Sequence, residues 1–183
     1  MSDLHQGQEA SAWVVRWMGL VASECSVLDV ACGSGRHARL LAGQGYRVVA
    51  LDRSADALAG LEQISGIRIV QADIESGVWP LSGQQFDVVI VTNYLHRSLF
   101  GVLLESVSES GLLIYETFAR GNASFGRPSN PAFLLERGEL LDRVRPVLKV
   151  LAYEDVQVVA PKPAMVQRIC ACGPSFQWPT VSR

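Results

Sequence analysis

Apolar positions in this chain recur at two spacings, and each spacing predicts one type of element. In residues 10–21 the large apolar side chains recur every three or four positions, which is typical of an amphipathic helix. Short continuous apolar runs predict strands at residues 26–31, 46–51, 67–71, 86–91 and 111–117. The fourth run is wholly β-branched from Val88 to Val91, as expected for a parallel strand that is covered on both faces.

Helical patterns separate these strands. They fall at residues 35–42, 55–63, 95–108 and 134–144. This alternation predicts a parallel sheet with right-handed crossovers. Two late strands, residues 147–159 and 164–172, are joined only by Pro161-Lys162-Pro163, which is too short for a crossover helix. We therefore expect an α/β fold with a doubly wound, mostly parallel, seven-stranded sheet and a C-terminal antiparallel hairpin.

Length and composition narrow the functional classes. The 183 residues are expected to form a single domain over 1–183, with residues 1–8 disordered. No apolar run approaches the roughly 20 residues that span a bilayer, and the start lacks a signal peptide's pattern, so we expect a cytoplasmic protein without a membrane partner. A formal net charge of −2 argues against a nucleic-acid partner. The four cysteines have neither C-x-x-C nor zinc spacing, so we expect reduced structural thiols and no metal site.

The most informative segment is residues 27–37, a short strand that runs into a glycine turn and then a helix. The glycines allow a close backbone approach, and the helix N-terminus offers free N–H groups to a ligand. Residues 33–38 also satisfy the dinucleotide fingerprint G-x-G-x-x-A, and the acidic Asp52 follows Gly33 at a suitable distance. However, Asp29 precedes the turn, where it would repel a pyrophosphate and attract an ammonium group. An ammonium-bearing ligand without phosphate is therefore favoured.

This segment resembles motif I of the class I (Rossmann-like) S-adenosylmethionine-dependent methyltransferases. Residues 86–144 are similar to small bacterial-type methyltransferases near the tellurite-resistance methyltransferase group. The resemblance implies a Rossmann-like sheet, S-adenosyl-L-methionine as the cofactor and S-adenosyl-L-homocysteine as the product. It implies in-line methyl transfer, in which the protein mainly aligns the partners and excludes water.

The resemblance also implies a cofactor-binding role for matching positions. Asp29 and the backbone of Gly33 and Gly35 would hold the methionyl ammonium and carboxylate. Asp52 would accept hydrogen bonds from both ribose hydroxyls, because a carboxylate presents two oxygens to a vicinal diol. Asp73, with the backbone of Ile74, would meet the adenine. The same set includes Ala31, Arg53 and Asn93. Taken singly, Asp29 or Asp73 could instead be a turn-forming aspartate.

Candidate catalytic residues lie after the fourth and fifth strands. Tyr94, His96 and Glu116 are candidate general bases, which are needed only if the acceptor is protonated at neutral pH. A thiolate, arsenic, selenium or tellurium acceptor would need none. Tyr94 and Asn93 are also placed to line the sulfonium pocket. The alternative for His96 is a helix-start histidine that is hydrogen-bonded to the backbone.

The longest irregular stretch, residues 119–132, follows the fifth strand and is placed to contact the acceptor. Arg97 is expected either to grip a substrate anion or to pair with Glu116 or Glu105. The full set of candidate substrate-binding residues is Arg97, Phe118, Arg120, Phe125 and Arg127. A solvated loop closed by turn residues is the alternative.

Four functional hypotheses follow, and the first is a methyltransferase for a small-molecule acceptor. A tRNA or protein methyltransferase comes second, and a basic patch joining Arg97, Arg120 and Arg127 would favour it. A non-catalytic S-adenosylmethionine-binding partner subunit comes third. Exposed Trp13, Trp17 and Leu4 would favour that, although we expect the two tryptophans to pack their helix on the sheet. An NAD-binding module comes last. The oligomeric state stays open, a homodimer included.

Overall fold

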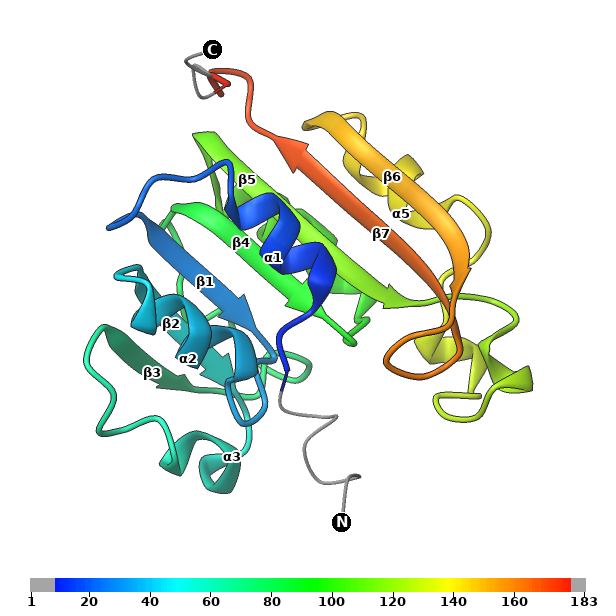
Figure 1. The fold of residues 1–183 in the computed structure, drawn as a ribbon, viewed down its shortest axis with the longest axis horizontal. Helices are drawn as coiled ribbons and strands as arrows, with labels where there is room; N and C mark the ends of the chain where they lie inside the picture. Colours follow the sequence, from blue (N-terminus) through cyan, green and yellow to red (C-terminus); the bar gives the residue numbers. More distant parts are fainter. Residues whose placement is uncertain (1–8, 179–183) are drawn as a thin grey trace.

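The computed structural model describes residues 9–178, so the predicted disorder of residues 1–8 falls outside the described part of the chain. Seven strands form a single sheet in the order β3-β2-β1-β4-β5-β7-β6 (Figure 1). Their bounds are β1 Ser26–Val30, β2 Arg47–Asp52, β3 Ile67–Gln71, β4 Phe86–Thr92, β5 Val107–Phe118, β6 Lys149–Val158 and β7 Ala164–Cys172. The seven-stranded α/β fold is thus confirmed.

The sheet is parallel except at its C-terminal hairpin. β1 pairs in parallel with β2 and β4, and β4 pairs in parallel with β5. β7 is antiparallel to both β5 and β6, because the short connection around Pro161 returns the chain directly beside itself. Strand order reverses between β1 and β4, which places the topological switch point at their carboxyl ends.

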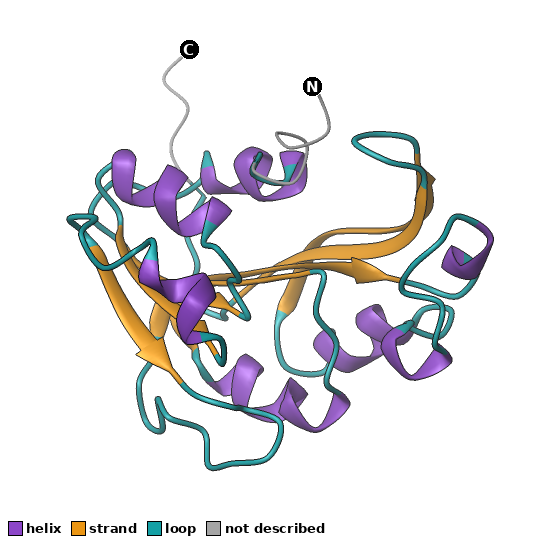
Figure 2. Cartoon of the chain, turned by 90° about the horizontal axis from the view of Figure 1, so that it is seen from below, coloured by secondary structure: helices purple, strands orange, loops and turns teal. Residues whose placement is uncertain are grey.

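Helices cover both faces of the sheet, as Figure 2 shows. Their bounds are α1 Ala12–Met18, α2 Arg36–Gly43, α3 Ala55–Ala59, α4 Phe100–Glu105 and α5 Glu139–Val144, with 3-10 turns η1 Arg97–Leu99, η2 Asn122–Ser124 and η3 Pro131–Phe133. The first three helices pack in one apolar core and the last two in the other. The stretch from Val88 to Val91 is fully buried between these layers, as its β-branched composition predicts.

The two tryptophans of α1 pack against the sheet, as predicted. Trp13 is 2% exposed and Trp17 is 8% exposed, and their rings meet edge to face at 5.6 Å. The indole N–H of Trp13 donates to the Ile169 carbonyl at 3.2 Å. Because both rings are buried, they form no exposed apolar patch, and Leu4 lies outside the described residues. The tryptophans therefore give no support to the hypothesis of a non-catalytic partner subunit.

The late cysteines lie in the core, where structural thiols are expected. Cys170 and Cys172 are buried in the same apolar core as α1, because alternate residues of a strand point to one face. All four cysteines are free thiols.

Three predicted helices are shorter than their patterns suggest, and each is ended or delayed by a tertiary or local constraint. The helix predicted at 95–108 is wrong at its end, because β5 already starts at Val107, which pairs with Phe86 before the register shifts. The helix predicted at 134–144 starts only after Gly138, a left-handed residue with φ 74°. The helix predicted at 55–63 ends at Ala59 and continues only as turns.

Across residues 9–178, no helix is long and apolar enough to cross a membrane. The same residues contain no group of three or more histidine, cysteine or acidic side chains arranged to hold a metal ion.

The packing of α1 predicts opposite outcomes for two adjacent valines. Val14 is 0% exposed and Val15 is 49% exposed. We expect Val14→Ala to lower the free energy of unfolding by about 2 kcal/mol, because it leaves a cavity under the helix. Val15→Ala should change it by no more than about 0.5 kcal/mol. Urea denaturation of the two variants measures this, and equal effects would contradict the burial of α1 on the sheet.

Candidate functional site

The glycine turn after β1 has the backbone geometry of a binding loop. Gly33 and Gly35 adopt φ values of 56° and 75°, and Ala31 adopts φ 52°, which is rare for a residue with a side chain. A Cβ on Gly35 would lie 2.6 Å from the Leu61 side chain, so packing also favours glycine there. A Cβ on Gly33 would meet no atom within 4 Å. The space outside Gly33 is therefore open to a ligand.

A second left-handed residue lies on the other side of the switch point. Asn93 has φ 55° directly after β4, and its N–H donates to the Glu116 carbonyl at 2.9 Å. Because β1 and β4 are neighbours, Ala31 and Asn93 flank the place where strand order reverses. Strained backbone of this kind clusters at functional sites.

Asp29 is a buried acid just before this turn. It is 1% exposed, and neither carboxylate oxygen has a hydrogen-bond partner of standard geometry among the described residues. Burial raises the pKa of Asp29 from 3.8 to about 7, and the nearby Ala38 backbone N–H and Arg36 offset this only in part. A buried acceptor pair without a donor calls for a cation. The ammonium group of S-adenosylmethionine fits this requirement, and a pyrophosphate does not.

Asp52, at the end of β2, ties the turn to the neighbouring strand. One oxygen accepts from the Gly33 N–H at 2.8 Å and the other from the Ser54 N–H at 2.9 Å. Each oxygen keeps a second lone pair, so the predicted contact with a ribose diol stays compatible with this geometry. Ser54 caps α3 by accepting from the Ala57 N–H.

Asp73 and Tyr94 lie together beyond the ends of β3 and β4. One Asp73 oxygen accepts from the Glu75 N–H at 3.0 Å, the turn-forming role that was its alternative. This hydrogen bond lowers the pKa of Asp73. The hydroxyl of Tyr94 is buried without a hydrogen bond of standard geometry, and burial together with Glu75 and Asp73 raises the pKa of Tyr94. Tyr94 therefore lies beside the predicted adenine end and stays protonated at neutral pH.

The other two catalytic candidates differ in their surroundings. Glu116 accepts from the Ser11 hydroxyl at 2.7 Å and pairs with Arg168 at 3.4 Å, so both of its oxygens are engaged. His96 is half-buried directly before η1, and its side chain makes no capping hydrogen bond.

Arg97 does not pair with either predicted partner. It donates to both oxygens of Glu139, at 2.8 and 2.9 Å, and to the carbonyls of Ala132 and Leu134. The expected pairing with Glu116 or Glu105 is wrong, because α5 brings Glu139 to the end of β4. Arg97 thus holds the segment before α5 in place.

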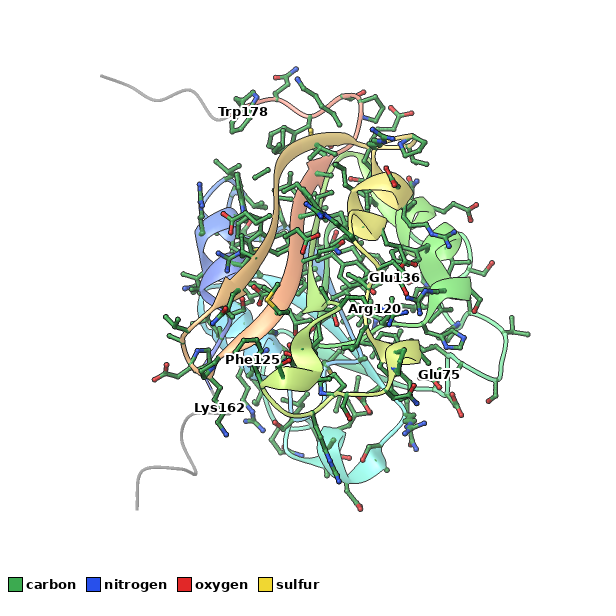
Figure 3. The ribbon with its side chains drawn as sticks, turned by 90° about the vertical axis from the view of Figure 1, so that its right-hand side faces the viewer. Glu75, Arg120, Phe125, Glu136, Lys162 and Trp178 are labelled. Carbon is green, nitrogen blue, oxygen red and sulfur yellow. The ribbon has the colours of Figure 1, made fainter. Side chains whose placement is uncertain are left out.

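Arg120, in the loop of residues 119–132, is also neutralised by a glutamate. It pairs with Glu136 at 2.6 Å, and Figure 3 shows the two residues adjacent. Phe125 and Arg127 are exposed farther along this loop, and Phe118 is half-buried at its start. Because Arg97 and Arg120 are both paired, the three arginines do not form the free basic patch that would favour tRNA.

Two open cavities, of about 770 and 370 Å³, lie beside this loop. Arg120 and Arg137 line both of them, and neither cavity includes the glycine turn.

Comparison with known proteins adds to this geometry. The family model described as a methyltransferase domain matches residues 27–107, from β1 to the start of β5. The match includes the glycine turn with its buried Asp29, as well as Asp52 and Asp73. Residues 27–107 therefore match a methyltransferase domain, and the chain is similar to the class I S-adenosylmethionine-dependent methyltransferases. S-adenosylmethionine is the cofactor of this family, so the dinucleotide interpretation of the glycine motif is set aside.

Solved structures share the methyltransferase fold at low sequence identity. TehB from Haemophilus influenzae is 19% identical with a TM-score of 0.73, and the match covers 90% of this chain and 62% of that chain. A methyltransferase from Mesorhizobium loti is 16% identical with a TM-score of 0.69, covering 91% and 100%. The glycopeptide N-methyltransferase MtfA, solved with S-adenosyl-L-homocysteine, is 16% identical with a TM-score of 0.63, covering 88% of each chain. No curated protein is significantly similar in sequence.

Sequence reasoning missed two buried polar residues that hold the segment between β5 and α5 in place. Asn122 is 1% exposed, donates to the Pro128 carbonyl and accepts from the Met165 N–H. Gln167 is 0% exposed, accepts from the Leu140 N–H and donates to the Glu136 carbonyl. Their only signal in the sequence is a polar residue in or beside an apolar strand pattern.

The raised pKa of Asp29 predicts a pH-dependent cost in stability. Below about pH 3 the group is protonated in both the folded and the unfolded chain. As pH rises toward 7, the folded state retains a proton that the unfolded chain releases, so the stability contributed by this group is lost. Between pH 5 and pH 8, Asp29→Asn should therefore gain about 2 kcal/mol of unfolding free energy relative to the wild type. Urea titrations at both pH values measure this. A constant difference would contradict the raised pKa.

Proposed function

We propose that this methyltransferase transfers the methyl group of S-adenosylmethionine to a small-molecule acceptor. One observation carries the cofactor site: a fully buried carboxylate without a hydrogen-bond donor lies before a turn of left-handed backbone. Asp29 would receive the ammonium there, while the N–H groups at the start of α2 would receive the carboxylate. Ala31, Gly33 and Gly35 shape the backbone around this end of the cofactor.

The remaining cofactor residues follow the carboxyl ends of the next strands. Asp52 would bind the ribose hydroxyls through its free lone pairs, with Arg53 beside it. Asp73 and the buried Ile74 would meet the adenine. Tyr94 belongs to this end of the site, since Asp73 and Glu75 influence its pKa. Asn93 turns the chain between the adenine end and the acceptor side.

The sulfonium supplies a reactive methyl carbon, to which the acceptor's lone pair forms a bond while the carbon–sulfur bond breaks and sulfur keeps the electrons. The chain has to align the acceptor and to receive a proton if the acceptor carries one. Tyr94 stays protonated and Glu116 is held in an ion pair. His96, whose side chain makes no capping bond, is therefore the strongest of the three candidate bases.

The acceptor side supports a small molecule over a nucleic acid. Arg97 and Arg120 are each neutralised by a glutamate, so little free positive charge faces a phosphate backbone. Phe118, Phe125 and Arg127 remain as candidates for an apolar pocket with one cation. The fold shared with TehB supports the resemblance to the tellurite-resistance methyltransferases, and a tellurium acceptor would need no general base.

Calorimetric titration tests the cofactor. We expect the wild type to bind S-adenosylmethionine and S-adenosylhomocysteine but not NAD. Affinity should fall as pH drops below about 7, because the Asp29 carboxyl must then lose its proton to pair with the ammonium. Asp29→Asn should weaken binding at least about 100-fold, the loss expected for a buried charged partner. Asp87→Asn, the same change at the amino ends of β1 and β4, away from the glycine turn, should bind normally. Retained affinity in a folded Asp29→Asn variant would refute the role of Asp29.

A screen with methyl-labelled S-adenosylmethionine tests the acceptor class. We expect label to move to small thiol, amine, selenium or tellurium compounds and not to tRNA or to protein. In an acceptor that carries a proton, His96→Gln should lower kcat while leaving cofactor affinity unchanged. Labelling of tRNA or protein alone would overturn the small-molecule proposal.

A further inference from the structure

The segment before α1 connects two separate parts of the site. The Glu9 carbonyl accepts from an Arg36 guanidinium N–H at 3.3 Å, and the Ser11 backbone N–H donates to His37 Nε2 at 3.0 Å. The Ser11 hydroxyl donates to Glu116 at 2.7 Å. It also accepts from the Trp13 N–H, so Ser11 is the N-cap of α1. One serine therefore contacts the cofactor helix, strand β5 and its own helix.

These contacts place the segment across the carboxyl edge of the sheet. Arg36 and His37 form the first turn of α2, immediately after the glycine turn, and Glu116 lies near the end of β5. Because β4 separates β1 from β5, a link between α2 and β5 passes over the end of β4. In Figure 1 the dark blue chain before α1 runs beside the arrowheads of β1 and β4. The segment therefore lies at the switch point, where the methionine end of the cofactor is proposed to bind.

His37 of α2 can hold residues 9–11 in place at neutral pH. His37 is 1% exposed, and burial together with the neighbouring Arg36 lowers the pKa of His37 to about 3. The ring is therefore neutral, and its Nε2 lone pair is free to accept from the Ser11 N–H. His37 has no role among the proposed cofactor contacts, so this interaction accounts for a buried polar ring.

Glu116 of β5 is also held in place by an arginine of β7. Arg168 of β7 stands in register between Glu116 and Glu154 and bonds to both. The Trp13 ring covers its guanidinium at 4.7 Å. Ser11 therefore donates to a carboxylate that cannot easily turn away.

We propose that Ser11 is a positioning residue that holds residues 9–11 across the proposed cofactor site and slows release of the cofactor. This inference rests on the proposed location of S-adenosylmethionine. If Ser11 were only a helix cap, its loss would destabilise α1 and leave cofactor affinity unchanged. If Ser11 closes the site, loss of its hydroxyl frees the segment from β5 and leaves it held only by the backbone bond to His37.

The test compares Ser11→Ala, at the N-cap of α1, with Val14→Ala, within α1. Both variants should lower the melting temperature through α1, one by removing its cap and one by removing a buried contact. Ser11→Ala should weaken S-adenosylhomocysteine binding about tenfold, mainly through faster dissociation, since it loses a hydrogen bond to a charged group. Val14→Ala should bind as the wild type does. Calorimetry and stopped-flow dissociation measure the two effects.

Two further variants separate the roles of the cap and the donor. Ser11→Thr keeps the hydroxyl and should restore wild-type binding. Ser11→Asp keeps a capping oxygen but places a second carboxylate against Glu116, so it should retain the cap of α1 and bind weakly. Wild-type affinity in Ser11→Ala or Ser11→Asp, or equal weakening by Val14→Ala, would overturn the proposal for Ser11 alone. Failure of the wild type to bind either cofactor form would instead refute the proposed cofactor site, and with it this inference.

Discussion

The reversal of strand order between β1 and β4 is the constraint on which the site depends. The crossovers that follow β1 and β4 leave in opposite directions along the sheet, so they diverge at the carboxyl ends of this pair. Ala31 and Asn93 adopt left-handed backbone at these two ends. The geometry therefore places left-handed backbone on both sides of the point where the two crossovers diverge, which is where we propose that the cofactor binds.

Placing Asp29 in that gap has a cost that a ligand can offset. Its carboxyl is buried without a donor, and its pKa rises to about 7. A free protein at neutral pH therefore holds a charge that it would be more stable without. Binding of an ammonium group would satisfy this charge and return the lost stability through mass action. Under the role proposed for Asp29, the free protein gives up stability at this position that the bound ligand would return.

The segment between β5 and α5 differs from the glycine turn, because its main polar groups already have hydrogen-bond partners within the protein. Arg97 bonds to Glu139 and to two carbonyls, while Gln167 bonds to the backbone on both sides of α5's start. These interactions tie the segment before α5 to η1 and to β7. Charge that looks available for a substrate in the sequence serves instead to fix the loop's shape.

The sequence by itself determined the features that depend on neighbouring residues. The strand, glycine turn and helix of residues 27–37 follow from a local apolar run and two glycines, and Asp29, Asp52 and Asp73 fall at strand ends that periodicity locates. Only the tertiary structure decided the partners of Arg97 and Ser11, because Glu139 and Glu116 are 42 and 105 residues away in the chain. It also shortened the helices expected at 95–108 and 134–144. Spacing encodes which face a side chain occupies, whereas an ion pair depends on how distant elements pack.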